Sequence, residues 1–349
     1  MDKSITLKKS RNIKVISVFM MLWLHLFGHP DRISKVEYIS LLNLGDKPGA
    51  EVIASFMGIC VTIFLFISGY GIYTKYKENF ELKDIKKIFI KIYLNYIIVF
   101  SIFLFIGFLL GKYKFQVNEF ISNLLTISNS YNREWWFLNT YLLLIMSYIL
   151  GKNIVKKYNF KKSILFFISL NFIGLILTKL NYSIDTEIYI LRIVADFMTV
   201  QIFFYSGILV AKYGVFDKIN EKIKMKKFIN VIMIMVITGI LIFKISIPII
   251  DNYIYYFIEI IYIFLLVNLI DENMFINKLS KHTTNIWLTH TFFCYYIFQK
   301  LTFLPKYSVL IFLWNLILCL CISNLINKIL EIIKIRIKDI RVSNLFIKS

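Results

Sequence analysis

The chain has 349 residues, 58% of them hydrophobic, and a mean hydropathy of +0.69. A water-soluble domain of this length cannot bury so much apolar surface, so the composition excludes one and predicts an integral membrane protein. The net charge of +20 does not indicate nucleic-acid binding, because the lysines lie in short segments between apolar runs, as in the loops of a membrane protein.

Apolar runs recur along the whole chain. About 20 apolar residues cross the hydrocarbon core as one helix. The sequence therefore predicts an all-α, polytopic membrane helix bundle with about ten transmembrane helices, near residues 13–29, 51–74, 87–110, 135–151, 163–179, 187–211, 228–249, 252–270, 284–303 and 308–330. Since the composition does not change between the runs, we expect a single transmembrane domain over residues 1–349 and no appended soluble domain.

The basic residues predict the orientation of these helices. With the N-terminus in the cytoplasm, the segments assigned to the inside hold 29 Lys and Arg residues, those assigned to the outside hold 8, and four lie within helices. Cytoplasmic loops of membrane proteins carry this kind of excess. We therefore expect both termini to be cytoplasmic, with the two long outer loops at residues 30–50 and 111–134.

The first predicted helix carries two ionisable residues, Lys14 and His25. They are eleven residues apart, which is close to three turns and about 16 Å along the axis, so both project from one face. Lys14 is expected at the cytoplasmic mouth and His25 deeper in the membrane. A histidine there can take a proton from a hydroxyl group, or it can simply hydrogen-bond a neighbouring helix. For Lys14 the structural alternative is snorkelling to the interface.

The third predicted helix begins with a cationic stripe. Lys87 and Lys91 are one turn apart at its cytoplasmic end. Such a stripe can bind a phosphate-bearing donor by point charge, or it can anchor the helix to anionic lipid. Lys91 lies deeper and is the stronger candidate for donor binding.

Other polar residues lie in or beside the predicted helices. His290 is in the ninth predicted helix, and Arg192 in the sixth stands four residues before an acidic side chain that can neutralise it. Glu134 opens the fourth helix from the outer face, where it can bind a sugar hydroxyl or serve only as a solvated helix start. Trp135 and Trp136 follow it, and their aromatic faces suit a sugar ring. The sequence contains no Walker loop, Rossmann glycine pattern or His/Cys metal cluster, so neither a bound metal nor a resident cofactor is expected.

Several blocks, in order, make the chain similar to the acyltransferase 3 family of bacterial integral-membrane O-acyltransferases. The resemblance covers most of the length. It rests on Lys14 to His25, on Phe64 to Tyr70, on the basic stretch Lys87 to Tyr96, and on Trp136 to Leu138, Phe203 to Ile208 and Trp287 to His290. Many members have arginine at the start of the first helix and an Arg-x-x-Arg pair in the third, whereas this chain has Lys14 and a Lys87-x-x-x-Lys91 arrangement. Lysine supplies the charge but not the planar, bidentate contacts of arginine.

The resemblance implies a multi-pass protein of the bacterial cell membrane that transfers an acyl group, usually acetyl. The donor is then cytoplasmic acyl-CoA and the acceptor a hydroxyl of a cell-surface polysaccharide or lipid-linked glycan, capsule or exopolysaccharide being favoured over peptidoglycan or teichoic acid. Many larger members carry a further extracytoplasmic domain, so this chain either acylates the acceptor itself or hands the group to a separate extracytoplasmic partner. The expected site comprises His25 and Lys14 as catalytic residues, Lys87 and Lys91 for acyl-CoA, Glu134, Trp135, Trp136 and Arg192 for the acceptor, and His290 as a proton relay.

Two alternatives fit parts of the same sequence. A transporter or flippase of a glycan precursor also has many spans, a basic cytoplasmic face and intramembrane charges. Such proteins are often built from repeated halves, and no internal repeat is evident here. The unrelated membrane-bound O-acyltransferase fold also uses an intramembrane histidine, but the order of the blocks fits it poorly.

Overall fold

The structure is a computed structural model that describes residues 5–183, 188–223, 226–242 and 250–346. It is 81% helical and contains almost no strand, which confirms the predicted all-α class. The strands β1 (Asn43–Leu44) and β2 (Lys47–Pro48) form a short antiparallel hairpin in the first long loop.

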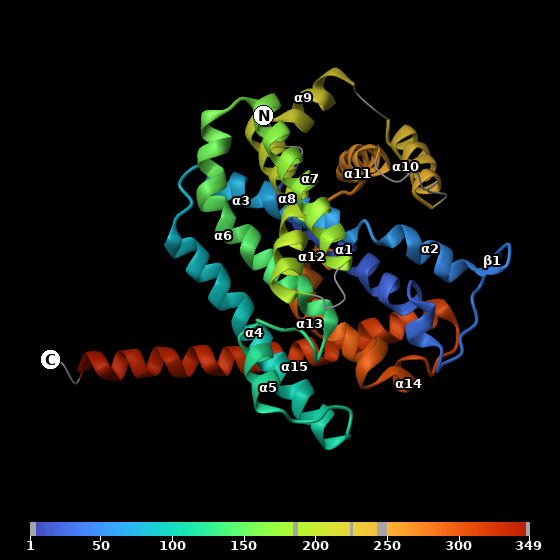
Figure 1. Cartoon of the computed structure of the whole chain (residues 1–349), viewed down its shortest axis with the longest axis vertical. Coiled ribbons are helices and arrows are strands. Elements are labelled where there is room, and N and C mark those ends of the chain that lie inside the picture. The colour runs from blue at the N-terminus through green and yellow to red at the C-terminus, as the bar shows by residue number, and fades with distance from the viewer. Residues whose placement is uncertain (1–4, 184–187, 224–225, 243–249, 347–349) are drawn as a thin grey trace.

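The helices follow one another in a bundle (Figure 1). In chain order they are α1 (Leu7–Phe27), α2 (Gly49–Met57), α3 (Cys60–Tyr76), α4 (Leu82–Leu109), α5 (Val117–Leu124), α6 (Trp136–Lys157), α7 (Phe160–Tyr182), α8 (Tyr189–Tyr213), α9 (Val215–Lys222), α10 (Lys227–Ile242), α11 (Ile250–Leu269), α12 (Met274–Leu279), α13 (Thr283–Thr291), α14 (Gln299–Thr302) and α15 (Ser308–Phe346). Short 3₁₀ segments η1 (Pro30–Ile33), η2 (Arg133–Trp135) and η3 (Ser280–His282) and the π-helical turn η4 (Phe292–Tyr296) connect them.

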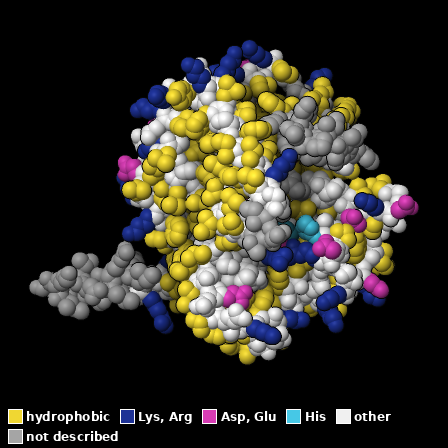
Figure 2. Space-filling model, in the orientation of Figure 1, with side chains coloured by type: hydrophobic (Ala, Val, Ile, Leu, Met, Phe, Trp, Pro, Cys, Tyr) yellow, Lys and Arg dark blue, Asp and Glu magenta, His cyan; other side chains and the backbone are white. Residues whose placement is uncertain are grey.

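Six helical stretches of the described residues are long and apolar enough to cross a membrane. They are Gly49–Tyr76, Leu82–Leu109, Arg133–Lys157, Phe160–Asn181, Tyr189–Tyr213 and Ser308–Arg336. Hydrophobic side chains cover much of the face that Figure 2 displays, as lipid contact requires. The chain is thus a multi-pass membrane protein, while the count of ten spans and the side on which each terminus lies stay predictions.

Three of the predicted segments differ from the helices observed. The segment at 51–74 is divided between α2 and α3 near Gly58, and the segment at 284–303 is divided among α13, η4 and α14. The last segment, predicted to end at residue 330, continues to Phe346 and projects beyond the bundle (Figure 1). Its 39 residues span about 58 Å, well beyond the thickness of a bilayer. Residues 243–249, the end of the seventh predicted helix, lie outside the described residues.

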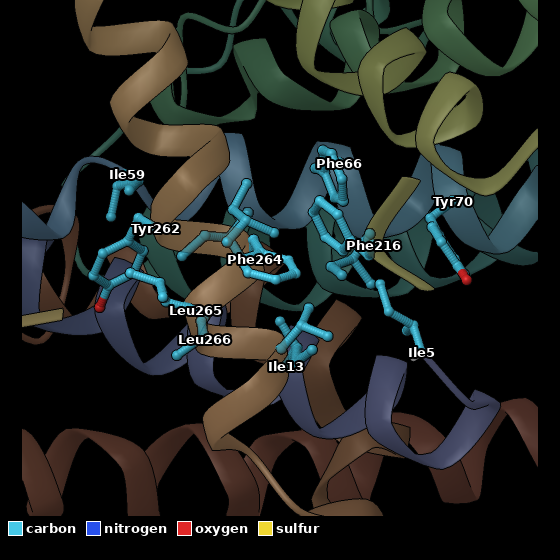
Figure 3. Packing of buried hydrophobic residues seen from close by; sticks show 14 of the residues in the cluster. Ile5, Ile13, Ile59, Phe66, Tyr70, Phe216, Tyr262, Phe264, Leu265 and Leu266 are labelled. Carbon is cyan, nitrogen blue, oxygen red and sulfur yellow. The ribbon is translucent and has the colours of Figure 1, made fainter. Parts of the chain in front are cut away.

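Aromatic packing joins helices that are far apart in the sequence. Phe66 of α3 stacks on Phe216 of α9 with ring centroids 5.5 Å apart, and Phe216 meets Phe264 of α11 edge-on at 5.0 Å. Ile13 of α1 is fully buried in the same cluster (Figure 3). This cluster holds α1 and α3 in place, and these two helices carry most of the site described below.

Two glycines allow α3 and α8 to pack with their backbones nearly in contact. A Cβ atom on Gly69 would lie 1.9 Å from the carbonyl oxygen of Phe204, and one on Gly207 would lie 2.0 Å from that of Phe66. Small residues permit this approach between membrane helices. Each glycine ends a Phe-x-Ser-Gly block, so these two blocks, which contribute to the family resemblance, are explained by helix packing.

Replacing Gly69 with leucine should therefore destabilise the protein by about 3 kcal/mol or more, because the backbones of α3 and α8 must separate to admit the side chain. We expect a large fall in the thermal unfolding midpoint in detergent. Gly71→Leu, on the same helix, is the matched control because a Cβ at Gly71 meets nothing within 4 Å. Equal midpoints for both variants would show that the two helices do not pack as described.

Candidate active site

Two cavities adjoin one another between α1, α3, α6 and α13. The first, which we call the histidine cavity, has a volume of about 200 Å³ and is lined by Ser17, Val18, Met21, Leu24, His25, Cys60, Val61, Phe64, Glu134, Trp136, Phe137, Trp287 and His290. The second, the lysine cavity, has a volume of about 350 Å³ and is lined by Lys14, Phe64, Ser68, Gly71, Ile72, Lys75, Tyr76, Ile88, Lys91, Ile92, Asn95, Phe137, Tyr141, Ser280, Thr283, Thr284 and Trp287. The two linings share three aromatic residues and differ in the charged groups they present.

Helical periodicity explains why α1 contributes to both cavities. Lys14 lines the lysine cavity, whereas Ser17, Met21 and His25 line the histidine cavity. These positions are separated by three or four residues, so they form one stripe along the helix. The prediction that Lys14 and His25 share a face is confirmed, and α1 thus forms a wall that runs from one cavity into the other.

The three shared residues, Phe64, Phe137 and Trp287, form what we call the aromatic partition. Phe137 meets Phe64 edge-on at 5.8 Å between ring centroids and meets Trp287 edge-on at 5.4 Å. Such T-shaped arrangements are the favoured geometry of aromatic pairs. The ammonium of Lys14 lies 5.0 Å from the centroid of the Phe64 ring, within the range of a cation–π contact. The partition therefore has an apolar side and a cationic side.

The lysine cavity collects positive charge and hydrogen-bonding groups. Lys14, Lys75 and Lys91 come from three different helices, and Asn95 of α4 lies one turn beyond Lys91. Among the described residues, no carboxylate forms an ion pair with Lys14 or Lys91. Lysine is a common partner of phosphate groups, so this cavity is chemically suited to a phosphorylated ligand.

The histidine cavity brings together two histidines that are 265 residues apart in the sequence. The rings of His25 and His290 have centroids 4.9 Å apart. Nδ1 of His290 lies 2.7 Å from the carbonyl oxygen of Trp287, which can only accept, so Nδ1 carries the proton and donates it to that oxygen. In the neutral ring this leaves the lone pair on Nε2, a buried atom without a hydrogen-bond partner among the described residues. The pair is thus equipped to accept protons.

A charged cluster borders the histidine cavity at Glu134. Arg32 of η1 forms an ion pair with Glu134 and donates a hydrogen bond of 2.9 Å to the hydroxyl of Tyr296, which in turn donates one of 2.8 Å to Glu134. The guanidinium of Arg32 also lies 3.8 Å from the centroid of the Tyr295 ring. Burial lowers the pKa of Arg32, but the hydrogen bond and charge of Glu134 outweigh burial and raise that pKa above its usual value. Glu134 is therefore fixed in position by two partners.

The structure brings together only part of the predicted set. His25, Lys14, Lys91, Glu134, Trp136 and His290 line the two cavities, whereas Lys87, Trp135 and Arg192 line neither. Lys87 is exposed on α4, Trp135 is buried and donates a hydrogen bond of 3.1 Å to the carbonyl of Leu288, and Arg192 forms an ion pair of 3.8 Å with Asp196 on α8.

Sequence reasoning missed two charged residues, Lys75 in the lysine cavity and Arg32 in the cluster that borders the histidine cavity. Arg32 stands in the loop after α1 and Lys75 at the end of α3, where an ordinary solvated charge needs no special explanation. Ser68 lies four residues after Phe64, and Lys75 lies seven residues after Ser68, so all three are on one face of the helix. This spacing could have predicted that Lys75 lines the cavity.

Comparison with known proteins identifies the family. The family model for the acyltransferase domain of the acyltransferase 3 family matches residues 10–327, nearly the whole chain. No curated protein and no solved structure matches the chain. The match includes α1 through most of α15 and thus every residue that lines the two cavities. The chain therefore belongs to the acyltransferase 3 family of membrane acyltransferases.

Proposed function

We propose that the protein transfers an acyl group, such as acetyl, from cytoplasmic acyl-CoA to a hydroxyl of a cell-surface polysaccharide, with capsule or exopolysaccharide favoured over peptidoglycan or teichoic acid. The observation that carries this proposal is the pair of adjoining cavities, one cationic and one containing two histidines, that meet at the aromatic partition. A donor with charged phosphates at one end and a thioester at the other matches this arrangement.

In this proposal the lysine cavity binds the donor. Lys14 and Lys91 meet the phosphates of CoA, and Lys75 adds a third charge. The uncharged pantetheine arm passes between the rings of the aromatic partition, which places the thioester in the histidine cavity. Lys87, one turn from Lys91 on α4 and exposed like it, lines neither cavity and contributes only to the surrounding potential.

The chemical step in this proposal is transfer from sulfur to oxygen. The acceptor hydroxyl attacks the thioester carbonyl, an O–C bond forms, and the C–S bond breaks. His25 takes the hydroxyl proton as general base and returns it to the departing CoA thiolate. His290 lines the same cavity, and its Nε2, which has no hydrogen-bond partner among the described residues, serves as a relay for that proton. Glu134 and the indole of Trp136 contact the sugar that carries the hydroxyl, as a carboxylate and an aromatic face can do.

Replacing Lys91 with alanine should weaken the binding of CoA by roughly tenfold, since a charge-assisted contact to phosphate contributes about 1.5–3 kcal/mol in a partly dry site and less where water reaches it. Binding of CoA to the purified protein in lipid nanodiscs measures this. The acceptor preference in membrane vesicles should not change, because Lys91 lies on the other side of the aromatic partition from the histidines.

Lys87→Ala is the comparison variant, because it removes the same charge one turn away without altering either cavity lining. Its effect on CoA affinity should be twofold or less and should disappear at high salt. If the two variants weaken CoA binding equally, the cavity is not the phosphate site and the general charge of the cytoplasmic face is responsible.

A further inference from the structure

The histidine cavity is mostly apolar even though it holds the two histidines and Glu134. Its remaining wall includes Val18 and Met21 of α1 and Cys60 and Val61 of α3. Val18 and Cys60 are each 3% exposed, and Met21 and Val61 pack against the cluster that contains Cys60. We call this part of the cavity the apolar lobe. None of its four side chains offers a strong hydrogen bond.

The chemistry of the apolar lobe excludes the sugar as its occupant. A sugar ring carries several hydroxyl groups, and each one placed against apolar walls without a partner costs free energy. An alkyl chain has no such requirement and gains free energy from the same burial. The polar groups that can receive a sugar belong to other residues of the lining, Glu134 and the histidines, so the lobe suits the non-polar end of the donor.

The volume of the cavity exceeds what an acetyl group needs. A water-sized group takes about 30 Å³, so a cavity of about 200 Å³ has room for about six such groups. Acetyl contributes three non-hydrogen atoms. The thioester sulfur takes a fourth place, so about two further carbon atoms fit when the donor is bound without the acceptor.

We propose that the apolar lobe is an acyl-chain pocket and that the protein accepts donors longer than acetyl, with an optimum near butyryl. This inference rests on the proposed function, since it assumes that acyl-CoA is the donor. Val61 is the specificity-determining residue, because it lines the lobe one turn from Phe64 of the aromatic partition, where an acyl chain bends away from the thioester.

The test is a chain-length series of binding measurements that needs no acceptor. CoA, acetyl-CoA, butyryl-CoA and octanoyl-CoA are titrated against the purified protein in lipid nanodiscs. Burial of each methylene should tighten binding about fourfold, so butyryl-CoA, which has two more methylenes, should bind about sixteenfold more tightly than acetyl-CoA. Octanoyl-CoA should gain no further affinity, because its chain exceeds the cavity.

Two variants of Val61 make the assignment specific. Val61→Phe fills the lobe, so butyryl-CoA should lose its advantage over acetyl-CoA while the affinity for CoA itself stays within twofold. Val61→Ala enlarges the lobe and should extend the gain in affinity beyond butyryl. Val194→Phe is the matched control, because Val194 is 38% exposed on α8 and lines neither cavity. Val194→Phe should leave the affinities of the four CoA compounds unchanged, and it shows how much affinity the surrounding lipid contributes.

The outcomes separate this inference from the proposed function. If CoA does not bind at all, the proposed function is wrong. If CoA and acetyl-CoA bind but butyryl-CoA binds no more tightly than acetyl-CoA, the donor assignment stands and the acyl-chain pocket is wrong. The same conclusion follows if affinity depends on chain length in the same way in Val61→Ala and Val194→Phe.

Discussion

Replacing His25 with alanine should lower the rate of acyl transfer by about 10²–10⁴-fold, the usual contribution of a positioned general base. His25 lines the cavity in which the thioester is placed, and its ring lies 4.9 Å from that of His290. Without it the acceptor hydroxyl keeps its proton during attack. Acetyl content of the surface glycan, measured by NMR, should fall to background, while CoA affinity and the thermal unfolding midpoint stay close to those of the unaltered protein.

His29→Ala is the matched control for this prediction. His29 follows His25 by one turn, with ring centroids 5.9 Å apart, but it lines neither cavity. It should keep most of the activity. Normal glycan acetylation in His25→Ala, with the protein present in the membrane, would remove His25 from the catalytic role, and equal losses in both variants would indicate a local structural effect.

Replacing Arg32 with alanine should have the second-largest effect, on stability as well as on the acceptor. Glu134, whose side chain is 10% exposed, would lose its ion-pair partner, and breaking a buried pair from one side costs about 3–5 kcal/mol. Because the Arg32 side chain is itself 25% exposed, water screens the ion pair in part. We therefore expect a loss of stability at the lower end of that range. The KM for the acceptor should rise, while CoA affinity stays unchanged because the lysine cavity is untouched.

Two further variants distinguish the ion pair from a general effect of charge. Arg133→Ala removes an exposed arginine next to Glu134 and should be nearly neutral. The double variant Arg32→Ala with Glu134→Gln should be more stable than Arg32→Ala alone, since it no longer buries an unpaired carboxylate. Additive losses in the double variant would show that Arg32 and Glu134 do not act as a pair.

The sequence predicted the features that depend on local periodicity. Apolar runs and helical spacing were enough to place α1 and to put Lys14 and His25 on one face of it. The same reasoning placed Lys87 and Lys91 on one stripe, but one turn, about 5 Å, decides which of them reaches the cavity. Likewise Trp135 and Trp136 are adjacent in sequence, but neighbouring residues of a helical segment project from different faces, and only Trp136 lines the histidine cavity.

The features that depend on packing between distant helices were not available from the sequence. His25 contacts His290, and Arg32 contacts Glu134 and Tyr296. These partners are 102 to 265 positions apart in the sequence, and no local pattern encodes such contacts. The two Ser-Gly blocks were visible as motifs, but their reason, the close approach of α3 and α8, appears only when both helices are in place.

The central claim is that the two cavities form one path for an acyl group, and transfer of label tests it most directly. Membrane vesicles that contain the protein and the surface glycan are given acetyl-CoA labelled in the acetyl group, and label in the glycan is counted. The account predicts label in the glycan that depends on His25 and is reduced by Lys91→Ala. Movement of a glycan precursor across the vesicle membrane without any transfer of label would contradict it and would identify a transporter.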